Sequence, residues 1–349
     1  MVYNLKRSVR AQDALPVDFY SECDSASTIE AIAEALRCGG HTVHLVEADA
    51  NLASWLAAHP VDVVFNIAEG ASGPHRESQV PAILESLEIP FTGSGSVTLA
   101  LALDKARTKQ VLAYEGIPTP AWQLFERADD ARNPKLAFPL IVKPNHEGSA
   151  KGIWRESVVW EDADLRRQIR RVLEQYHQAA LVEEFIAGAE LTVGVLGNDP
   201  PAALPILEID FSSCARSGEF FYSWRMKEYQ GDDARGLAPT FHCPARISPS
   251  IARRMQALAI RAHHALGCRE FSRTDIRLRS DGVPFVLEVN PLPGLDPSES
   301  NFPIMTTAAG MPYAALINRL VEMAVVRSRG RTHLQELPMS LLVASPVTP

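Results

Sequence analysis

The sequence lacks the features of a disulfide-stabilised, zinc-binding or membrane-spanning protein. Its five cysteines are scattered, odd in number and never spaced as Cys-x-x-Cys. This pattern predicts reduced thiols in a cytosol, with neither a structural zinc site nor a disulfide framework. The chain begins without an apolar signal core, and no stretch reaches membrane-spanning length. We therefore expect a cytoplasmic protein that does not enter a membrane.

Signatures of nucleic-acid binding and of dinucleotide binding are also absent. The formal net charge of −8 argues against a general binder of nucleic acid or of an anionic membrane. No Gly-x-Gly-x-x-Gly follows the first predicted strand, which argues against a nicotinamide-dependent oxidoreductase. What remains is an ordinary globular composition, 46% hydrophobic and 22% charged in 349 residues, with room for two or three domains.

The first third of the chain alternates between predicted strands and predicted helices. This succession indicates a doubly wound α/β domain over about residues 10–95. The expected strands are Leu15–Tyr20, Thr42–Val46, Val61–Ile67 and Pro90–Thr92, and the expected helices are Thr28–Arg37, Leu52–Ala57 and Ser78–Leu87.

The rest of the chain predicts a small α+β unit at 134–196, followed by a longer mixed segment. A helix is expected at Asp104–Tyr114, and the unit itself has strands at Phe138–Lys143, Ala180–Phe185 and Leu191–Leu196 and a helix at 161–176. The later segment has strands near 203–210, an irregular stretch at 212–240, helices at 248–266, 303–309 and 313–327, and a hairpin at 271–290.

The hairpin stretch, FSRTDIRLRSDGVPFVLEVN, carries the strongest local signal. Asp281-Gly282 between two alternating runs predicts a two-residue turn. That turn pairs Asp275 with Glu288, and Arg273 with Asn290, on one face of the ribbon. The opposite face is predicted to join the core through Ile276, Leu278, Phe285, Leu287 and Val289.

Two carboxylates directly opposite each other on a sheet repel, so the pair requires a neutralising partner. A divalent cation such as Mg²⁺, held by carboxylates and phosphate oxygens, is one solution. The alternative is that Arg273 and Arg277 neutralise the acids on a solvated sheet face. The hairpin alone leaves both open.

Two further segments are compatible with nucleotide binding. In Lys143–Gly152, KPNHEGSAKG, the glycines permit close backbone approach, so N–H groups and the Ser149 hydroxyl could hold phosphate oxygens. The segment is not a Walker A loop, and an ordinary hairpin loop is the alternative. In LVEEFIAGAEL at 181–191, acids around a turn could accept hydrogen bonds from adenine and ribose, or could simply be solvated.

Taken in order, Lys105, KPNHEGSAKG, VEEFIAGAELTV and SRTDIRLR…FVLEVNPLPG resemble the ATP-grasp superfamily, and within it the D-alanine–D-alanine ligases. The upstream segment VFNIAEG…QVPAILESLEIPFTGSGSVTLALALDKARTKQVL extends the resemblance over residues 28–325. It implies an α/β protein with the ATP-grasp fold. A doubly wound α/β domain at 1–104 would precede two α+β subdomains that clasp ATP, at 105–198 and 199–328. A tail at 329–349 would follow, and a homodimer is also implied.

The resemblance implies a role for each matching residue. Lys105 and Lys143 would reach the ATP phosphates, and Ser149 would lie in the loop that covers them. Lys227 would close over the γ-phosphate from a mobile lid within 212–240. Arg273 would stabilise an acyl phosphate and the tetrahedral intermediate that follows it.

The same resemblance places the base, the ribose and the metal ions. Glu183 would accept from the adenine amino group, while the backbone of Glu184 to Ile186 would line the base and Glu190 would bind the ribose. Two Mg²⁺ ions are implied, for which Mn²⁺ could substitute. Their ligands would be Asp275, Glu288 and Asn290, with Glu288 bridging both ions.

The likeness weakens in the substrate pocket. Glu22 lies only near the position of the acid that holds the first substrate's ammonium, because the expected Gly-Gly-x-Ser loop is missing. Glu69 stands where the ligases have a histidine, and Glu228 where they have a lid tyrosine. Glu299 replaces the serine that binds the second substrate's carboxylate. Ser298 and Ser300 flank Glu299 and could take over.

The main prediction is therefore an ATP-dependent, ADP-forming carboxylate–amine ligase that acts on small amino-acid-like substrates through an acyl phosphate. Its acceptor is not simply D-alanine, because an extra amine or guanidinium would suit Glu69 and Glu299. Alternatively, both acids pair with Arg76 or other basic groups. An authentic D-alanine–D-alanine ligase of cell-wall synthesis and a non-catalytic ATP-binding protein remain the other two readings.

Overall fold

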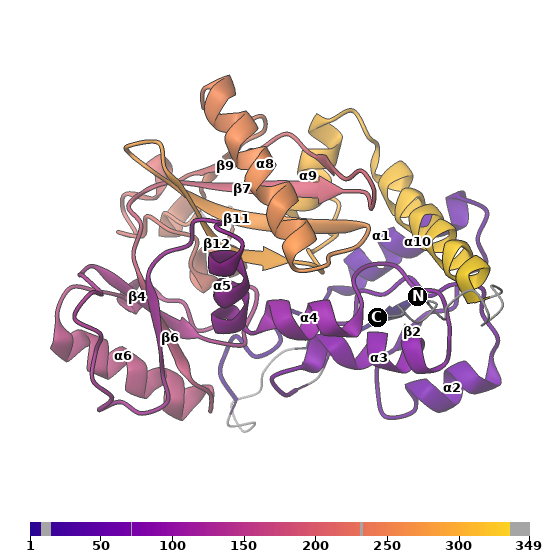
Figure 1. Ribbon diagram of the computed structural model, residues 1–349, viewed down its shortest axis with the longest axis horizontal. Coiled ribbons are helices and arrows are strands. Elements are labelled where there is room, and N and C mark those ends of the chain that lie inside the picture. Colours follow the sequence, from indigo (N-terminus) through magenta and orange to yellow (C-terminus); the bar gives the residue numbers. More distant parts are fainter. Residues whose placement is uncertain (8–14, 71, 231–232, 336–349) are drawn as a thin grey trace, which may run out of the picture.

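The computed structural model describes residues 1–7, 15–70, 72–230 and 233–335. Its sheets form three groups along the chain, as Figure 1 shows: a small parallel sheet near the N-terminus, a four-stranded sheet and a six-stranded sheet. The chain is thus α/β, with a parallel unit followed by two antiparallel sheets, in the order that the sequence predicts. Within this described part, every helix falls short of the length or apolarity that crossing a bilayer requires.

The N-terminal unit has short parallel strands surrounded by helices. Strand β1 (Val2–Tyr3) pairs with β2 (Val46–Glu47), and isolated parallel bridges join Val2 to Asn66 and Val64 to Phe91. The helices are α1 (Ala26–Cys38), α2 (Leu52–Ala58), α3 (Gln79–Ser86) and α4 (Ser96–Leu103), and a 3-10 turn at Arg76–Ser78 leads into α3.

The predicted strands of this unit are mostly wrong in extent, whereas its predicted helices are confirmed. Residues 15–20 form no strand, because successive turns follow Pro16 and the Asp18 carboxylate accepts hydrogen bonds from Gly152 N and Tyr176 Oη. The run Val61–Ile67 is buried only from Val64 onwards and makes only the two bridges. Helix α4 was not predicted.

Helix α1 illustrates why the helical predictions hold. The Ser25 hydroxyl caps its first turn by accepting from Thr28 N at 3.1 Å, and the chain turns at Gly40 with φ 86°. Ile29, Ile32 and Leu36 recur on one face and are buried against α10 (Tyr313–Gln335). Helix α10 extends beyond its predicted end at 327, and residues 336–349 of the predicted tail lie outside the described residues.

The central unit packs one helix on an antiparallel sheet. The sheet order is β3 (Trp122–Phe125), β6 (Ala180–Glu184), β4 (Leu140–Pro144) and β5 (Val158–Val159). Helix α6 (Asp162–Gln175) buries Leu165, Ile169 and Val172 against it. Helix α5 (Lys105–Tyr114) enters this unit from α4, and the Asp104 carboxylate caps it by accepting from Arg107 N at 3.0 Å.

The C-terminal sheet has six strands in the order β10-β9-β7-β11-β12, with β8 beside β7. The strands are β7 (Gly188–Leu196), β8 (Ala202–Ala203), β9 (Leu207–Asp210), β10 (Thr240–His242), β11 (Phe271–Arg279) and β12 (Pro284–Asn290). Helix α8 (Pro249–Ala265) lies across one face in Figure 1, and α9 (Asn301–Ala308) follows the hairpin. Strand β6 belongs to the four-stranded sheet, and β7 pairs with β11 in the six-stranded sheet. The chain therefore passes from one sheet to the other between β6 and β7, before the predicted domain limit at 198. The domain limits stay a prediction.

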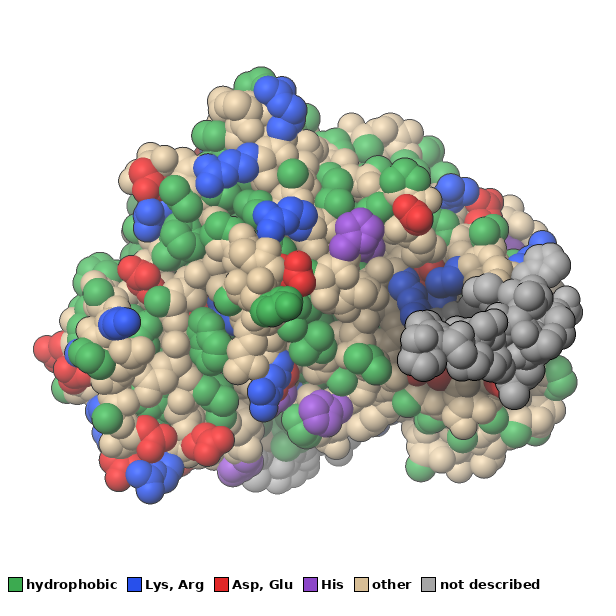
Figure 2. Space-filling model, in the orientation of Figure 1, with side chains coloured by type: hydrophobic (Ala, Val, Ile, Leu, Met, Phe, Trp, Pro, Cys, Tyr) green, Lys and Arg blue, Asp and Glu red, His purple; other side chains and the backbone are tan. Residues whose placement is uncertain are grey.

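The surface carries both signs of charge. On the face drawn in Figure 2, basic and acidic side chains of the described residues are interspersed among apolar ones and gather into no large patch of one sign.

Gly188 sets the close contact that begins the β7–β11 pairing. Its φ is 149°, and an added Cβ would collide with the carbonyl oxygen of Leu278. We expect Gly188→Ala to lower the free energy of unfolding by about 2 kcal/mol or more in urea titrations. Gly40→Ala is the matched control, since φ is 86° there but no atom lies within 4 Å of the added Cβ. Equal losses for the two variants would contradict the steric explanation.

Candidate active site

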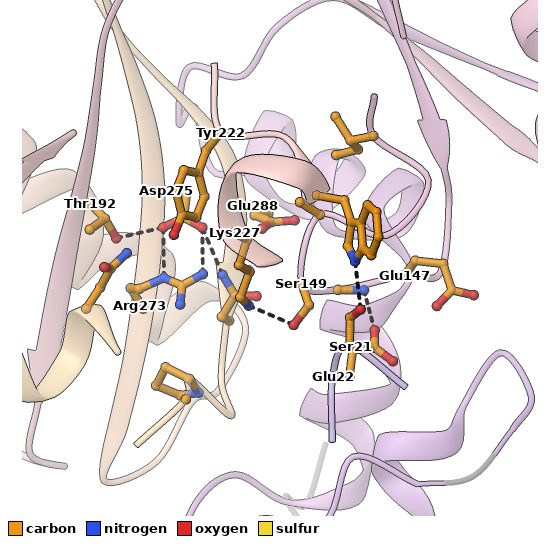
Figure 3. A pocket seen from close by; sticks show the side chains of 18 of the residues that line it. Ser21, Glu22, Glu147, Ser149, Thr192, Tyr222, Lys227, Arg273, Asp275 and Glu288 are labelled. Atoms are coloured by element: carbon orange, nitrogen blue, oxygen red, sulfur yellow. Dashed lines mark hydrogen bonds and ion pairs between the residues drawn. The ribbon is translucent and has the colours of Figure 1, made fainter. Parts of the chain in front are cut away.

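The candidate active site is a cavity of about 340 Å³ between the three units. The C-terminal hairpin forms one side, and the loop after β4 together with the segment Ser21–Ser25 forms the other (Figure 3). Helix α7 (Trp224–Glu228) borders it from the stretch predicted as the lid. All the sequence-predicted site residues except Ser298 line this cavity.

The predicted pairing at the functional end of the hairpin is confirmed. Asp275 pairs with Glu288, and Arg273 pairs with Asn290. The predicted two-residue turn is wrong, however. Arg279 N donates to Val283 O, so the loop has three residues, and Gly282 adopts φ 80°. A bulge then shifts the pairing by one residue between Asp275 and Ile276, so that Asp275 faces Glu288 as predicted even though the turn differs.

The bulge also changes which side chains enter the core. Val286 is fully buried and packs with Ile276 and Val289, although the alternation predicted Leu287 there. Leu287 instead lines the cavity next to Glu288. Phe285 is only partly buried, with the guanidinium of Arg279 over its ring. Periodicity cannot reveal a one-residue bulge, so this part of the core prediction fails.

Cations hold both acids of the hairpin. Arg273 donates to both oxygens of Asp275 at 2.9 and 2.8 Å, and Thr192 Oγ1 donates to Asp275 Oδ1 at 2.6 Å. Lys105 Nζ lies 3.1 Å from Glu288. Burial alone would raise the pKa of Glu288, but the charges of Lys105 and other nearby cations outweigh it and hold this pKa well below its usual range.

The donor set of the hairpin suits a hard divalent cation. Asp275, Glu288 and Asn290 offer two carboxylates and one amide to the same cavity. No group of three or more His, Cys, Asp or Glu side chains within the described ranges could enclose a metal ion. Protein ligands as few as these fit Mg²⁺, which is commonly held by one or two carboxylates and completed by phosphate oxygens and water.

Two lysines meet at the buried carboxylate of Glu183. Lys143 Nζ lies 2.7 Å from one oxygen and Lys109 Nζ lies 2.6 Å from the other. Lys109 was not predicted, although it lies four residues after Lys105 on α5 and so faces the same way. Burial would raise the pKa of Glu183, but the two lysines lower it overall, so this carboxylate is ionised in the cavity wall.

The glycine-containing loop reaches the lid. Ser149 and Ala150 have φ of 51° and 57°, and Ser149 Oγ accepts a hydrogen bond of 2.8 Å from Lys227 Nζ (Figure 3). Lys105 Nζ donates to the carbonyl of Glu147 in the same loop. The predicted phosphate-binding groups therefore converge on one place.

The predicted ribose acid is bound to an arginine. Glu190 Oε2 accepts from Arg277 at 2.7 Å and from Tyr222 N at 3.3 Å. Burial outweighs these contacts and raises the pKa of Glu190. Glu184 and Ile186 line the same side of the cavity, as predicted.

The stretch predicted as the lid is attached to several parts of the molecule. Trp224 Nε1 donates to Ser21 Oγ at 2.8 Å, and its backbone N donates to Ile153 O at 3.0 Å. Glu228, which replaces the expected tyrosine, binds Lys6 at 3.0 Å. Helix α7 thus contacts both the N-terminal unit and the central unit.

Glu22 belongs to a buried ionic network that the sequence did not reveal. Arg76 donates to both its oxygens and also reaches Glu147 at 3.0 Å, while Lys151 lies 3.2 Å from Glu22 and close to Glu147. Burial would raise the pKa of Glu22, but Arg76 and Lys151 lower it to about 2. Arg76 therefore pairs with Glu22 and Glu147 rather than with Glu69 or Glu299.

Three other acids occupy the substrate end of the cavity. Burial, with the charges of neighbouring acids, raises the pKa of Glu69 well above its usual value and that of Glu77 to about 8. Burial likewise raises the pKa of Asp24 to about 7. Glu77 and Asp24 were not predicted, and no local pattern distinguishes them from surface acids.

Of the three residues predicted for the second substrate, Glu299 and Ser300 line the cavity and Ser298 does not. Glu299 is exposed and lines the cavity. Ser298 Oγ donates to Asp296 at 2.8 Å outside the lining, and Ser300 Oγ accepts from Asp296 N at 3.0 Å.

Comparisons with known proteins agree with this geometry. The family described as "D-ala D-ala ligase C-terminus" matches residues 111–322. The D-alanine–D-alanine ligase of Erythrobacter litoralis is 36% identical, over 87% of this chain and 89% of the relative. An uncharacterised protein of Sinorhizobium fredii is 33% identical, over 84% of this chain and 86% of the relative.

A solved structure shares the fold over nearly the whole chain. The D-alanine–D-alanine ligase from Bacillus anthracis, crystallised with ATP, superposes with a TM-score of 0.71. The match covers 95% of this chain and 99% of that one, at 23% sequence identity.

Proposed function

Because this chain belongs to the D-alanine–D-alanine ligase family of ATP-dependent ligases, we propose that it joins two amino acids, with D-alanyl-D-alanine as product. The observation that carries the proposal is the convergence of Lys105, Arg273 and Glu288 with the Ser149 loop on one cavity. The names of the relatives favour D-alanine in both positions over the predicted different acceptor.

The proposed reaction has two steps. The carboxylate of the first amino acid attacks the γ-phosphorus of ATP, the bond to the ADP oxygen breaks, and an acyl phosphate forms. The amine of the second amino acid then attacks the acyl carbon, loses a proton and expels phosphate. Neither step requires a nucleophilic side chain, so catalysis depends on positioning and charge.

The cavity residues supply that positioning. Lys105 and Lys143 would hold phosphate oxygens, and Arg273 would face the charge that develops at the reacting carboxyl group. Asp275, Glu288 and Asn290 would hold Mg²⁺, which when bound supplies positive charge to the phosphates. Helix α7, with Lys227 at Ser149, would exclude water, because water would hydrolyse an acyl phosphate.

A product assay tests the proposal. We expect ADP release from ATP and Mg²⁺ to depend on D-alanine, and mass spectrometry to detect the dipeptide. Release without any amino acid, or no release with any pair of amino acids, would contradict ligase activity on amino acids.

A second candidate function keeps D-alanine as donor but uses an acceptor with an additional amine or guanidinium. It is favoured by Glu299, an exposed acid of the cavity whose carboxylate has no hydrogen bond or ion pair to any described residue. The same assay distinguishes the two, because lysine or arginine would then raise ADP release above D-alanine alone. A mixed dipeptide would replace the homodipeptide.

A further inference from the structure

Two acids of the cavity have no hydrogen-bonding or ionic partner among the described residues. Glu69 and Glu77 both line the cavity, and Glu77 is only 8% exposed. Across the described residues, neither carboxylate makes a hydrogen bond or an ion pair. A carboxylate buried to this degree is normally hydrogen-bonded or paired, so this arrangement requires an explanation.

The nearby cations are committed elsewhere. Arg76 and Lys151 bind Glu22 and Glu147. Lys105 binds Glu288, and Lys227 donates to Ser149. The protein therefore pairs Glu22 directly with two cations, whereas Glu69 and Glu77 feel the charge of Arg76 only from a distance.

The position of the pair relates it to the reacting carboxyl group. Glu77 lies close enough to Glu288 and Lys105 for their charges to act on its pKa, and Glu69 lies close enough to Lys227 to influence the pKa of that lysine. The pair thus adjoins the groups that would surround the γ-phosphate. In an α-amino acid only one carbon separates the ammonium group from the carboxyl group. A donor placed for phosphorylation would therefore keep its ammonium group inside the same cavity, whose lining includes both acids.

We propose that Glu69 and Glu77 form the subsite for the ammonium group of the donor amino acid, in place of Glu22, whose oxygens are already occupied. This inference rests on the proposed function, because it assumes a donor that is phosphorylated at its carboxyl group. A charge-assisted hydrogen bond to each carboxylate would neutralise both acids and select amino acids over carboxylic acids without an amine.

Binding measurements test the pair independently of turnover. Calorimetric titrations of D-alanine, glycine, L-alanine and L-lysine are made with a non-hydrolysable ATP analogue and Mg²⁺ present, and propionate serves as the amine-free probe. We expect at least one amino acid to bind the wild-type chain and propionate to bind at least 10-fold more weakly. Glu69→Gln and Glu77→Gln should each weaken amino-acid binding at least 10-fold, while affinity for the ATP analogue stays within twofold.

Two controls separate this role from a structural one. Glu88→Gln removes an exposed acid from the same unit and should leave every affinity unchanged. Because neither acid has a hydrogen bond or an ion pair to lose within the described residues, the unfolding temperature of each cavity variant should equal or exceed that of the wild type. The Mg²⁺ concentration needed for half-maximal ADP release should also stay the same, since the pair does not bind the metal ion.

Several results would overturn the proposal. One is that Glu69→Gln and Glu77→Gln bind amino acids as tightly as the wild type does, or that only Glu22→Gln loses this affinity. The others are a changed Mg²⁺ requirement in Glu77→Gln and a wild-type chain that binds none of the amino acids. Propionate that drives ADP release as well as D-alanine would refute the subsite and leave the ligase standing. Amino-acid binding that requires Glu69 and Glu77 without any dipeptide product would refute the proposed function and leave the subsite standing.

Discussion

Glu288→Gln is expected to reduce ligase turnover by about 10³-fold, because one ionised carboxylate of the candidate Mg²⁺ site becomes neutral. The remaining acid, Asp275, is already held by Arg273 and Thr192. Lys105 would also lose its ion pair with Glu288 and its fixed position near the phosphates. Steady-state ADP release at saturating ATP, Mg²⁺ and D-alanine measures the loss.

Asp281→Asn is the matched control for this variant. It removes the same charge from the tip of the same hairpin, where Asp281 is 50% exposed and pairs with Arg279. We expect its turnover to remain within twofold of the wild type. Equal activity of Glu288→Gln and the wild type, with both variants folded by circular dichroism, would refute the role of the hairpin acids.

Arg76→Met is expected to lower the free energy of unfolding by about 3–5 kcal/mol, because it leaves the buried acids Glu22 and Glu147 with Lys151 alone. The side chains of Arg76 and Glu22 are each 6% exposed, so water cannot compensate for the lost cation. Urea-induced unfolding followed by circular dichroism measures the change.

Two further variants define the origin of this loss. Adding Glu22→Gln to Arg76→Met should recover part of the stability, because it removes one uncompensated charge. Arg246→Met is the exposed control, since Arg246 also binds two acids but is 53% exposed, and its loss should stay below about 1 kcal/mol. A loss in Arg76→Met as small as that of Arg246→Met would contradict the network.

The effect of Arg76 should also depend on pH. The folded-state pKa of Glu22 is lowered to about 2, below its value in the unfolded chain. The ionic stabilisation is therefore fully present above the unfolded pKa of about 4.3 and disappears as the pH falls towards 2. The stability difference between the wild type and Arg76→Met should shrink over that range.

The sequence predicted most of the helices, though not α4 or α7, and the functional end of the hairpin, because these depend on local patterns. Caps such as Ser25 and Asp104 fix where helices begin, and the alternation beside Gly282 indicates a hairpin. The bulge beyond Asp275 is a one-residue shift in pairing, so periodicity could not reveal it. The strand predicted at Val61–Ile67 is buried from Val64 onwards, but it meets its neighbours through isolated bridges instead of a ladder.

Residues that meet only through the fold could not be predicted in the same way. Arg76 lies far along the chain from Glu22 and Glu147, and no spacing rule relates the three. Lys109 could have been found, because Lys105 and Lys109 are one helical turn apart. Of the two proposed substrate acids, Glu69 was predicted through the resemblance alone, and Glu77 carries no local signal, since its proposed role depends on the cations that Glu22 and Glu288 have already taken.

The network around Arg76 also decides how amino acids and ATP would enter and leave. It holds the Ser149 loop against the N-terminal unit through buried ion pairs. Separating these pairs would leave several buried charges without partners at once. That side of the cavity is therefore a fixed wall. Helix α7 is held by a few hydrogen bonds and by the half-exposed pair of Lys6 and Glu228. We therefore expect substrates to enter on the side of α7, and the hydrogen bond between Trp224 and Ser21 to break when they do.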